Sequence, residues 1–219
     1  MFYFSFLHNI KCFITFVYNI KGGVKMEVQP FKNMSDIDKI KRYLLKKGNM
    51  RNYNLFIMGI NVGLRISDLL SLKLNDVWNF ETFTPFDEVV LREQKTEKIR
   101  RIKLNQSVKD SLRMYVDSLQ TIKEDGWLFQ SRKKEFHLTY QSVNRMINQW
   151  VNDCRIKGNY GSHSFRKTFS YHLYMNNSEN PMILPYLMKI LNHSSQSITL
   201  RYIGIEGETI NNLYDDLNL

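Results

Sequence analysis

From Met26 onward, apolar residues recur at helical spacing almost throughout the chain, and the period changes only once. The change lies at residues 88–104, where two runs of strand-forming residues flank a short polar segment. Two such runs joined by a polar turn are typical of a β-hairpin. We therefore expect a mainly α fold with one small antiparallel β-sheet, an α+β domain. The longer helices are predicted at 107–119, 140–154, 165–175, 182–191 and 209–217.

Three shorter helices are predicted before the hairpin. Ser35 can cap the first of them, which has Ile37, Ile40 and Leu44 on one face. No linker or internal repeat separates these helices from the rest, so a single domain is expected. The second and third helices should cover residues 53–60 and 65–72.

The composition favours a globular domain with a polyanionic partner. Hydrophobic residues make up 43% of the chain, which excludes a disordered protein. Lys and Arg number 31 against 21 Asp and Glu, a formal net charge of +10 that favours binding to nucleic acid. Cys12 and Cys154 lie far apart and form no CxxC pair, which excludes a zinc ribbon or a disulfide scaffold.

Residues 1–25 form an apolar extension with three possible explanations. A membrane segment needs about 20 predominantly apolar residues, whereas the run here is shorter and is interrupted by polar residues. A genuine N-terminal helix is the second explanation. The third, which we favour, is a start assigned too far upstream, because the codons of Lys-Gly-Gly shortly before Met26 resemble a ribosome-binding sequence. The expected organisation is this extension followed by one domain at 26–219.

Four polar clusters carry residue types that can do chemistry. Taken singly, each has an ordinary explanation: a solvated ion pair on a helix, a solvated basic turn, a surface pair and a core tyrosine. The tyrosine follows the preceding histidine by nine residues. In chain order the clusters hold Arg65 with Asp68, Lys95 in the hairpin, His163 with Arg166, and His193 with Tyr202.

Together and in this order, the clusters resemble the motifs of the tyrosine recombinases, also called phage integrases. Residues 63–72, Gly-Leu-Arg-Ile-Ser-Asp-Leu-Leu-Ser-Leu, fit the family's first box, (A/G)-L-R-x-(S/G)-(E/D)-L-x-x-L. The hairpin matches the family's K-x-x-K-x-R pattern at Lys95, Lys98 and Arg100.

The two later boxes each carry one substitution. The family's H-x-L-R box has Phe in place of Leu between His163 and Arg166, and its L-G-H box has Asn192 in place of Gly before His193. Both substitutions affect neighbours of the functional side chains. The resemblance covers about residues 28–202 and implies the fold of a recombinase catalytic domain, without the N-terminal core-binding domain that such enzymes usually have.

The resemblance also implies a reaction: Tyr202 attacks a DNA phosphodiester and forms a 3′-phosphotyrosine intermediate. Two arginines stabilise the negative charge that develops on the phosphate, and Lys95 is the general acid for the leaving 5′ oxygen. His163 would accept or pass on the tyrosine proton, and His193 would donate a hydrogen bond to the phosphate. No metal, ATP or other cofactor is expected. The implied catalytic residues are Arg65, Lys95, His163, Arg166, His193 and Tyr202, with Asp68 in support.

Double-stranded DNA is the expected partner, and most basic contacts should go to its phosphates. The resemblance further implies a homotetramer on synapsed DNA, with the segment 208–219 docked on a neighbouring protomer; packing on its own domain is the alternative. An accessory DNA-binding protein could supply affinity that a catalytic domain alone lacks. We expect a cytoplasmic protein that binds no membrane. The predicted DNA-binding residues are Lys98, Arg100, Arg132, Lys133 and Lys134.

Two other functions stay open on the sequence alone. A type IB topoisomerase uses similar chemistry and would relax supercoils without strand exchange. A DNA-binding accessory protein would use the basic surface without catalysis. The complete set of six catalytic side chains argues against the second.

Overall fold

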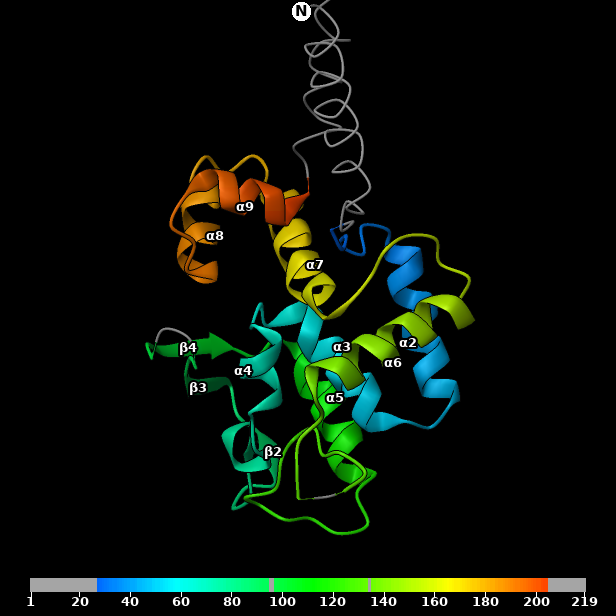
Figure 1. Ribbon diagram of the computed structural model, residues 1–219. Coiled ribbons are helices and arrows are strands. Elements are labelled where there is room, and N and C mark those ends of the chain that lie inside the picture. Colours follow the sequence, from blue (N-terminus) through cyan, green and yellow to red (C-terminus); the bar gives the residue numbers. More distant parts are fainter. Residues whose placement is uncertain (1–26, 95–96, 134, 205–219) are drawn as a thin grey trace, which may run out of the picture.

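The computed structural model describes residues 27–94, 97–133 and 135–204 (Figure 1). The extension 1–25, the side chains of Lys95 and Lys134, the predicted helix 209–217 and the docking segment lie outside the described residues. In chain order the described elements are α2 (Met34–Lys46), α3 (Met50–Asn61), α4 (Ile66–Leu70), a 3-10 turn (Leu74–Asp76), β1 (Trp78–Asn79), β2 (Thr84–Pro85), β3 (Glu88–Arg92), β4 (Ile99–Lys103), α5 (Gln106–Asp117), α6 (Tyr140–Asp153), α7 (Ser162–Met175), α8 (Ile183–Leu191) and α9 (Gln196–Ile203).

The expected mainly α fold with antiparallel β structure is confirmed. The hairpin forms as predicted, with Val89 paired to Ile102 and Leu91 to Arg100. A second two-stranded sheet, β1 with β2, was not predicted, because its strands are only two residues long. Helix α9 was not predicted either, and it carries Tyr202.

The helix ends depend on capping residues. The predicted cap at Ser35 was wrong, because Asn33 takes that position and α2 begins at Met34. The predicted face of α2 is nevertheless the buried one. Asn49 caps α3 by accepting a hydrogen bond from the backbone N–H of Asn52. The third predicted helix is shorter than expected and covers only α4.

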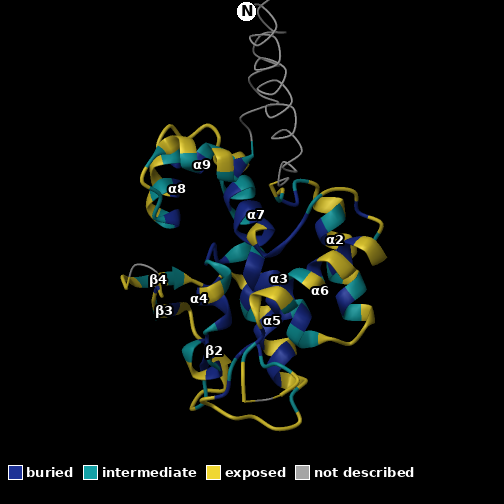
Figure 2. Ribbon diagram, in the orientation of Figure 1, coloured by how far each residue is buried: buried dark blue, intermediate teal, exposed yellow. Residues whose placement is uncertain are grey.

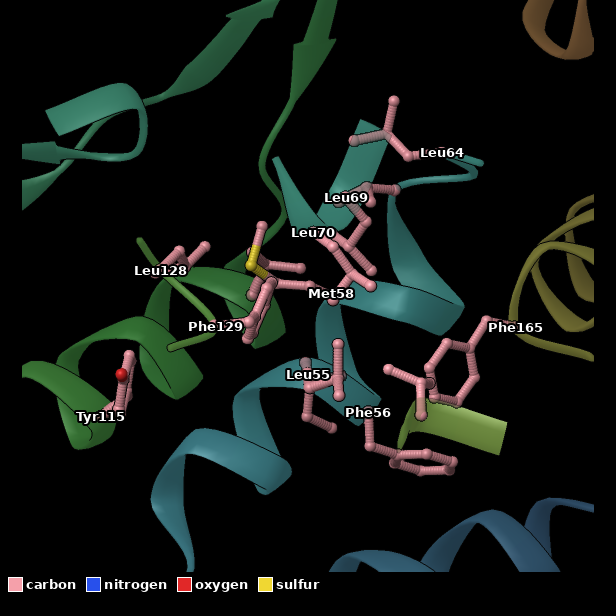
Figure 3. Packing of buried hydrophobic residues seen from close by; sticks show 14 of the residues in the cluster. Leu55, Phe56, Met58, Leu64, Leu69, Leu70, Tyr115, Leu128, Phe129 and Phe165 are labelled. Carbon is pink, nitrogen blue, oxygen red and sulfur yellow. The ribbon is translucent and has the colours of Figure 1, made fainter. Parts of the chain in front are cut away.

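The elements from α2 through α6 and the start of α7 share one large hydrophobic core. Figure 3 shows the centre of this core. The ring of Phe56 meets that of Phe165 edge-on, with centroids 5.9 Å apart. Gly59 permits this close approach of α3 and α7, since a Cβ there would lie 2.4 Å from the Phe165 ring. The second half of α7 extends from this core and packs with α8 and α9 around a small second cluster.

The described helices include none that is both long and apolar enough to cross a membrane. The longest described helices, α6 and α7, have 14 residues each. A spanning helix needs about 20.

Candidate active site

Arg65 lies at the start of α4, where a left-handed turn at Gly63 (φ +63°) directs the chain into the helix. Its Nη1 donates to Oε2 of Glu93 at 2.9 Å and lies 3.8 Å from Oδ2 of Asp68. Both carboxylates are fully buried, whereas the Arg65 side chain keeps 22% of its surface exposed. Among the described residues, its Nη2 and Nε have no hydrogen-bond partner, so they can bind an anion.

Glu93 is a site residue that the sequence analysis missed. Its second oxygen, Oε1, accepts from Nη1 of Arg100 at 2.7 Å, so one buried carboxylate bridges two arginines. Its burial agrees with the period of the strand, because Val89 and Glu93 are buried while Val90 and Arg92 between them are exposed. That alternation was the signal that could have identified it.

The base of the hairpin turn is held by backbone bonds beside Glu93. The N–H of Glu93 donates to the carbonyl of Lys98 at 3.0 Å, and the N–H of Gln94 donates to Oδ1 of Asp68 at 3.1 Å. Lys95 itself lies outside the described residues. Lys98 Nζ lies 3.5 Å from Oδ1 of Asn192 at the end of α8, which joins the hairpin to the C-terminal helices.

Arg166 is buried on α7 and is anchored by neutral groups. Its Nη1 donates to the carbonyl of Gly63 at 3.0 Å, and its Nη2 donates to the carbonyl of Leu191. Its buried Nε has no partner among the described residues. Burial is the main cause that lowers the pKa of Arg166 to about 10, and the charge of Arg65 adds to it. Arg166 is still charged at pH 7.

His193 and Tyr202 lie side by side, with ring centroids 4.7 Å apart. Nδ1 of His193 is 3.1 Å from the hydroxyl of Thr199 on α9. Burial and the charges of Arg166 and Arg65 lower the pKa of His193 to about 4, so its ring is neutral at pH 7. The residue before it, Asn192, has φ +51°, a conformation that Gly and then Asn tolerate best. The substitution in the L-G-H box thus preserves the backbone turn.

His163 lies at the second position of α7 and is exposed. Its ring meets that of Tyr140 at 6.4 Å, and burial with the charges of Arg166 and Lys167 lowers its pKa. Of the two histidines, His193 is the one with a described ring contact to Tyr202.

Lys167 is a second residue that the sequence analysis missed. It is buried, its Nζ pairs with Oε1 of Glu27 at 2.7 Å, and the same Nζ lies 5.7 Å from the centroid of the Tyr202 ring. A cation at that distance interacts with an aromatic ring.

Three of the four polar clusters of the sequence lie together around α7, since Arg166 bonds to Gly63 and Leu191 and His193 contacts Tyr202. Lys95, from the remaining cluster, lies outside the described residues.

A cavity of about 500 Å³ opens between the hairpin and the C-terminal end of α8. The described residues contain no group of three or more His, Cys, Asp or Glu side chains that could hold a metal ion. The lining of the cavity includes two cations of the hairpin and one of α8, and its residues are Glu93, Lys98, Ile99, Arg100, Met188, Lys189, Asn192 and His193.

The predicted DNA-binding residues are not brought together. Arg100 is largely buried against Glu93, and Lys98 borders the cavity. Arg132 and Lys133 are instead on the loop between α5 and α6, which Figure 1 shows at the end of the molecule away from α8 and α9. Lys134 lies outside the described residues.

Comparisons with known proteins agree with this geometry. Residues 30–208 match the phage integrase family. The chain is 38% identical to the probable integrase/recombinase YoeC of Bacillus subtilis (strain 168) over 187 residues. This alignment covers 85% of the chain and 95% of YoeC. It spans only 48%, 58% and 49% of three further curated relatives.

Two solved structures share the fold. XerA recombinase superposes with a TM-score of 0.65 at 19% identity, over 89% of this chain and 67% of that one. The catalytic domain of bacteriophage HP1 integrase superposes with a TM-score of 0.55 at 19% identity, over 87% of this chain and 95% of that domain. The family match, the relative in B. subtilis and the arrangement of the arginines, histidine and tyrosine lead to one conclusion: the chain belongs to the phage integrase family of tyrosine recombinases.

Proposed function

We propose that this protein is a site-specific recombinase that cuts and rejoins double-stranded DNA through a 3′-phosphotyrosine intermediate on Tyr202. The observation that carries the proposal is the meeting of Tyr202, His193 and Arg166 at one place, with Arg166 bonded to the carbonyls of Gly63, near Arg65, and of Leu191, near His193. Nucleophile, proton acceptor and anion-binding groups are the parts that this chemistry needs.

The first half-reaction forms one bond and breaks another. The Tyr202 oxygen bonds to phosphorus, and the bond from phosphorus to the 5′ oxygen breaks. The phenolic proton goes to a neutral histidine; the ring contact favours His193, with His163 as the alternative. The 5′ oxygen leaves with a proton from Lys95, the general acid of the proposal.

Charge stabilisation comes from the two arginines. Nη2 and Nε of Arg65 and the fork of Arg166 would bind the nonbridging oxygens as negative charge develops on them. Preorganised donors of this kind are typically the largest contribution to such catalysis.

In the second half-reaction the 5′ oxygen of another strand bonds to phosphorus and the bond from phosphorus to the Tyr202 oxygen breaks. The proton of the attacking hydroxyl returns to Lys95, and Tyr202 takes its proton back from the histidine. The covalent intermediate conserves the bond energy, so the proposal needs neither ATP nor a metal ion.

We further propose that the protein acts as a homotetramer on two synapsed duplexes, with the segment 208–219 of each protomer docked on a neighbouring protomer. An accessory DNA-binding protein would assist it, and it would act in the cytoplasm. We also propose that one catalytic domain begins at Met26.

A nicked suicide substrate tests the proposal. Nicked duplexes tiled across the DNA that flanks the gene should give an SDS-resistant covalent complex with the wild-type protein in EDTA. Tyr202→Phe should bind the same duplexes without forming the complex, because it lacks the nucleophilic oxygen. Tyr186→Phe is the matched control, since Tyr186 is an exposed tyrosine on α8.

Three outcomes would contradict the proposal. An adduct that persists in Tyr202→Phe would make another tyrosine the nucleophile. Binding without any adduct in the wild type would favour the accessory protein. Relaxation of supercoiled DNA without strand exchange would favour a topoisomerase.

A further inference from the structure

We propose that Glu93 is a positioning residue of this site, which ties the phosphate-binding Arg65 to the base of the turn that carries Lys95. The inference rests on the proposed function. Glu93 belongs to none of the motifs quoted for the family. It enters the site through its contacts alone.

The first step is the carboxylate itself. Glu93 is fully buried, with Oε2 on Arg65 at 2.9 Å and Oε1 on Arg100 at 2.7 Å. A buried charge is tolerated only when it is paired and hydrogen-bonded, and here each oxygen has a cationic donor. Arg65 and Arg100 are separated by 35 residues in the sequence (100 − 65) and come from α4 and β4. Glu93 therefore fixes the hairpin against α4.

The second step is the backbone of the turn. The N–H of Glu93 bonds to Lys98, and its carbonyl accepts from the N–H of Glu97 at 2.8 Å. Glu93 is thus bonded through its own backbone to both Glu97 and Lys98. Gln94, the next residue, is bonded to Asp68. Two buried carboxylates, both close to Nη1 of Arg65, are therefore bonded to the described residues at the base of this turn.

The third step is the charge on Arg65. Both carboxylates approach Nη1, and the remaining nitrogens have no partner among the described residues. Glu93 also shares its charge with Arg100. The arrangement orients Arg65 without covering the donors that a phosphate needs. The opposite role, in which Glu93 competes with the phosphate, predicts that its removal would speed cleavage.

The experiment compares two leaving groups. In one suicide substrate the scissile phosphate has its ordinary 5′ oxygen, and in the other a 5′ sulfur replaces it. A thiol ionises with a pKa of about 8.5, so a thiolate leaves without a proton from a general acid. We expect Glu93→Gln to form the covalent complex about 100-fold more slowly with the oxygen substrate, a loss typical of general acid catalysis. The sulfur substrate should restore most of that loss, as it should for Lys95→Ala.

Arg65→Lys and Glu88→Gln are the comparisons. Arg65→Lys should react slowly with both substrates, because lysine keeps the charge but does not place the guanidinium donors of Arg65 at the phosphate. Glu88 is on the same hairpin but is exposed and paired with exposed Arg101, so Glu88→Gln should act like the wild type. Glu93→Asp keeps the charge on a shorter side chain, and its intermediate rate serves if Glu93→Gln does not fold.

Two results would overturn the inference, and a third would overturn the proposed function. If sulfur does not restore Glu93→Gln and Glu93→Asp, Glu93 acts on Arg65 and not on the turn. If either variant is as fast as the wild type or faster with the oxygen substrate, Glu93 does not position the site. A wild type that forms no adduct with either substrate overturns the proposed function instead.

Discussion

Two regions of the molecule build the site, and they differ in how firmly they are packed. The body, α2 to α6 with the start of α7, surrounds the large core. The C-terminal unit, α8 and α9, buries four hydrophobic residues, Ile183, Leu187, Leu191 and Ile203. Figure 2 shows the contrast, with buried residues concentrated in the body and mostly intermediate or exposed ones in α8 and α9.

The residues of the proposed site are divided between these regions by their proposed roles. Arg65, Asp68 and Glu93 belong to the body, whereas His193 and Tyr202 belong to the C-terminal unit. Segments with few buried apolar contacts open locally at a lower free-energy cost than a core does. The proposed anion-binding charge is therefore held by the firmly packed body, and the proposed nucleophile by the C-terminal unit, which we expect to open more easily.

Arg166 is the group that joins the two regions. We therefore expect its replacement to have the largest effect on the reaction. One arm of its guanidinium bonds to Gly63 in the body and the other to Leu191 in the C-terminal unit. Arg166→Lys keeps a charge but cannot bond to both carbonyls and the phosphate. We expect the covalent complex to form about 10³-fold more slowly, measured in a single turnover on the suicide substrate.

Arg145→Lys is the matched control, because Arg145 is an exposed arginine on α6. It should react at the wild-type rate. If Arg166→Lys also reacted within threefold of the wild type, the link between the regions would not matter for the chemistry.

The sequence predicted the parts of the fold that local patterns determine. The buried face of α2 follows from residues spaced at a helical period, and the hairpin follows from two strand-like runs around a charged turn. Helix α9 could not be recognised in this way, because it is eight residues long and buries only Thr199 and Ile203. Its clearest local signal is Ser195, whose hydroxyl accepts from the N–H of Ile198 as an N-cap.

The candidate site was predicted where motifs mark it and missed where distant charges meet. The alternation of β3 indicates which face Glu93 lies on, but not its pairing with Arg65, 28 residues away, which together with Arg100 makes the burial of its charge tolerable. Lys167 likewise pairs with Glu27 across 140 residues. No local period contains either pairing.

Two core substitutions test whether the C-terminal unit opens separately from the body. Leu187 on α8 and Leu112 on α5 are both fully buried, and replacing a core leucine with alanine costs about 3 kcal/mol. We expect Leu187→Ala to speed amide hydrogen exchange mainly in residues 183–203, with little change in the midpoint of global unfolding. Leu112→Ala should lower that midpoint for the whole domain. An even loss of protection in Leu187→Ala would mean that α8 and α9 are not a separate unit.

The smallest expected effect is a pH dependence that His193 confers on the C-terminal unit. Its pKa is about 4 in the folded protein, below the ordinary value of about 6.5. Between these values the unfolded chain binds more protons than the folded one, so stability falls as pH decreases from about 6.5 to about 4. Because the ring is partly exposed, solvent screening should limit this loss to about 1 kcal/mol.

Urea unfolding at pH 7 and pH 5 measures this dependence. His193→Gln should flatten the loss between the two pH values, since glutamine binds no proton. Part of the loss should remain in this variant, because burial lowers the pKa of His163 in the same direction. If His193→Gln kept the full wild-type loss, burial and the charges of the two arginines would not lower the pKa of His193, and the body would not control the protonation of the group beside Tyr202.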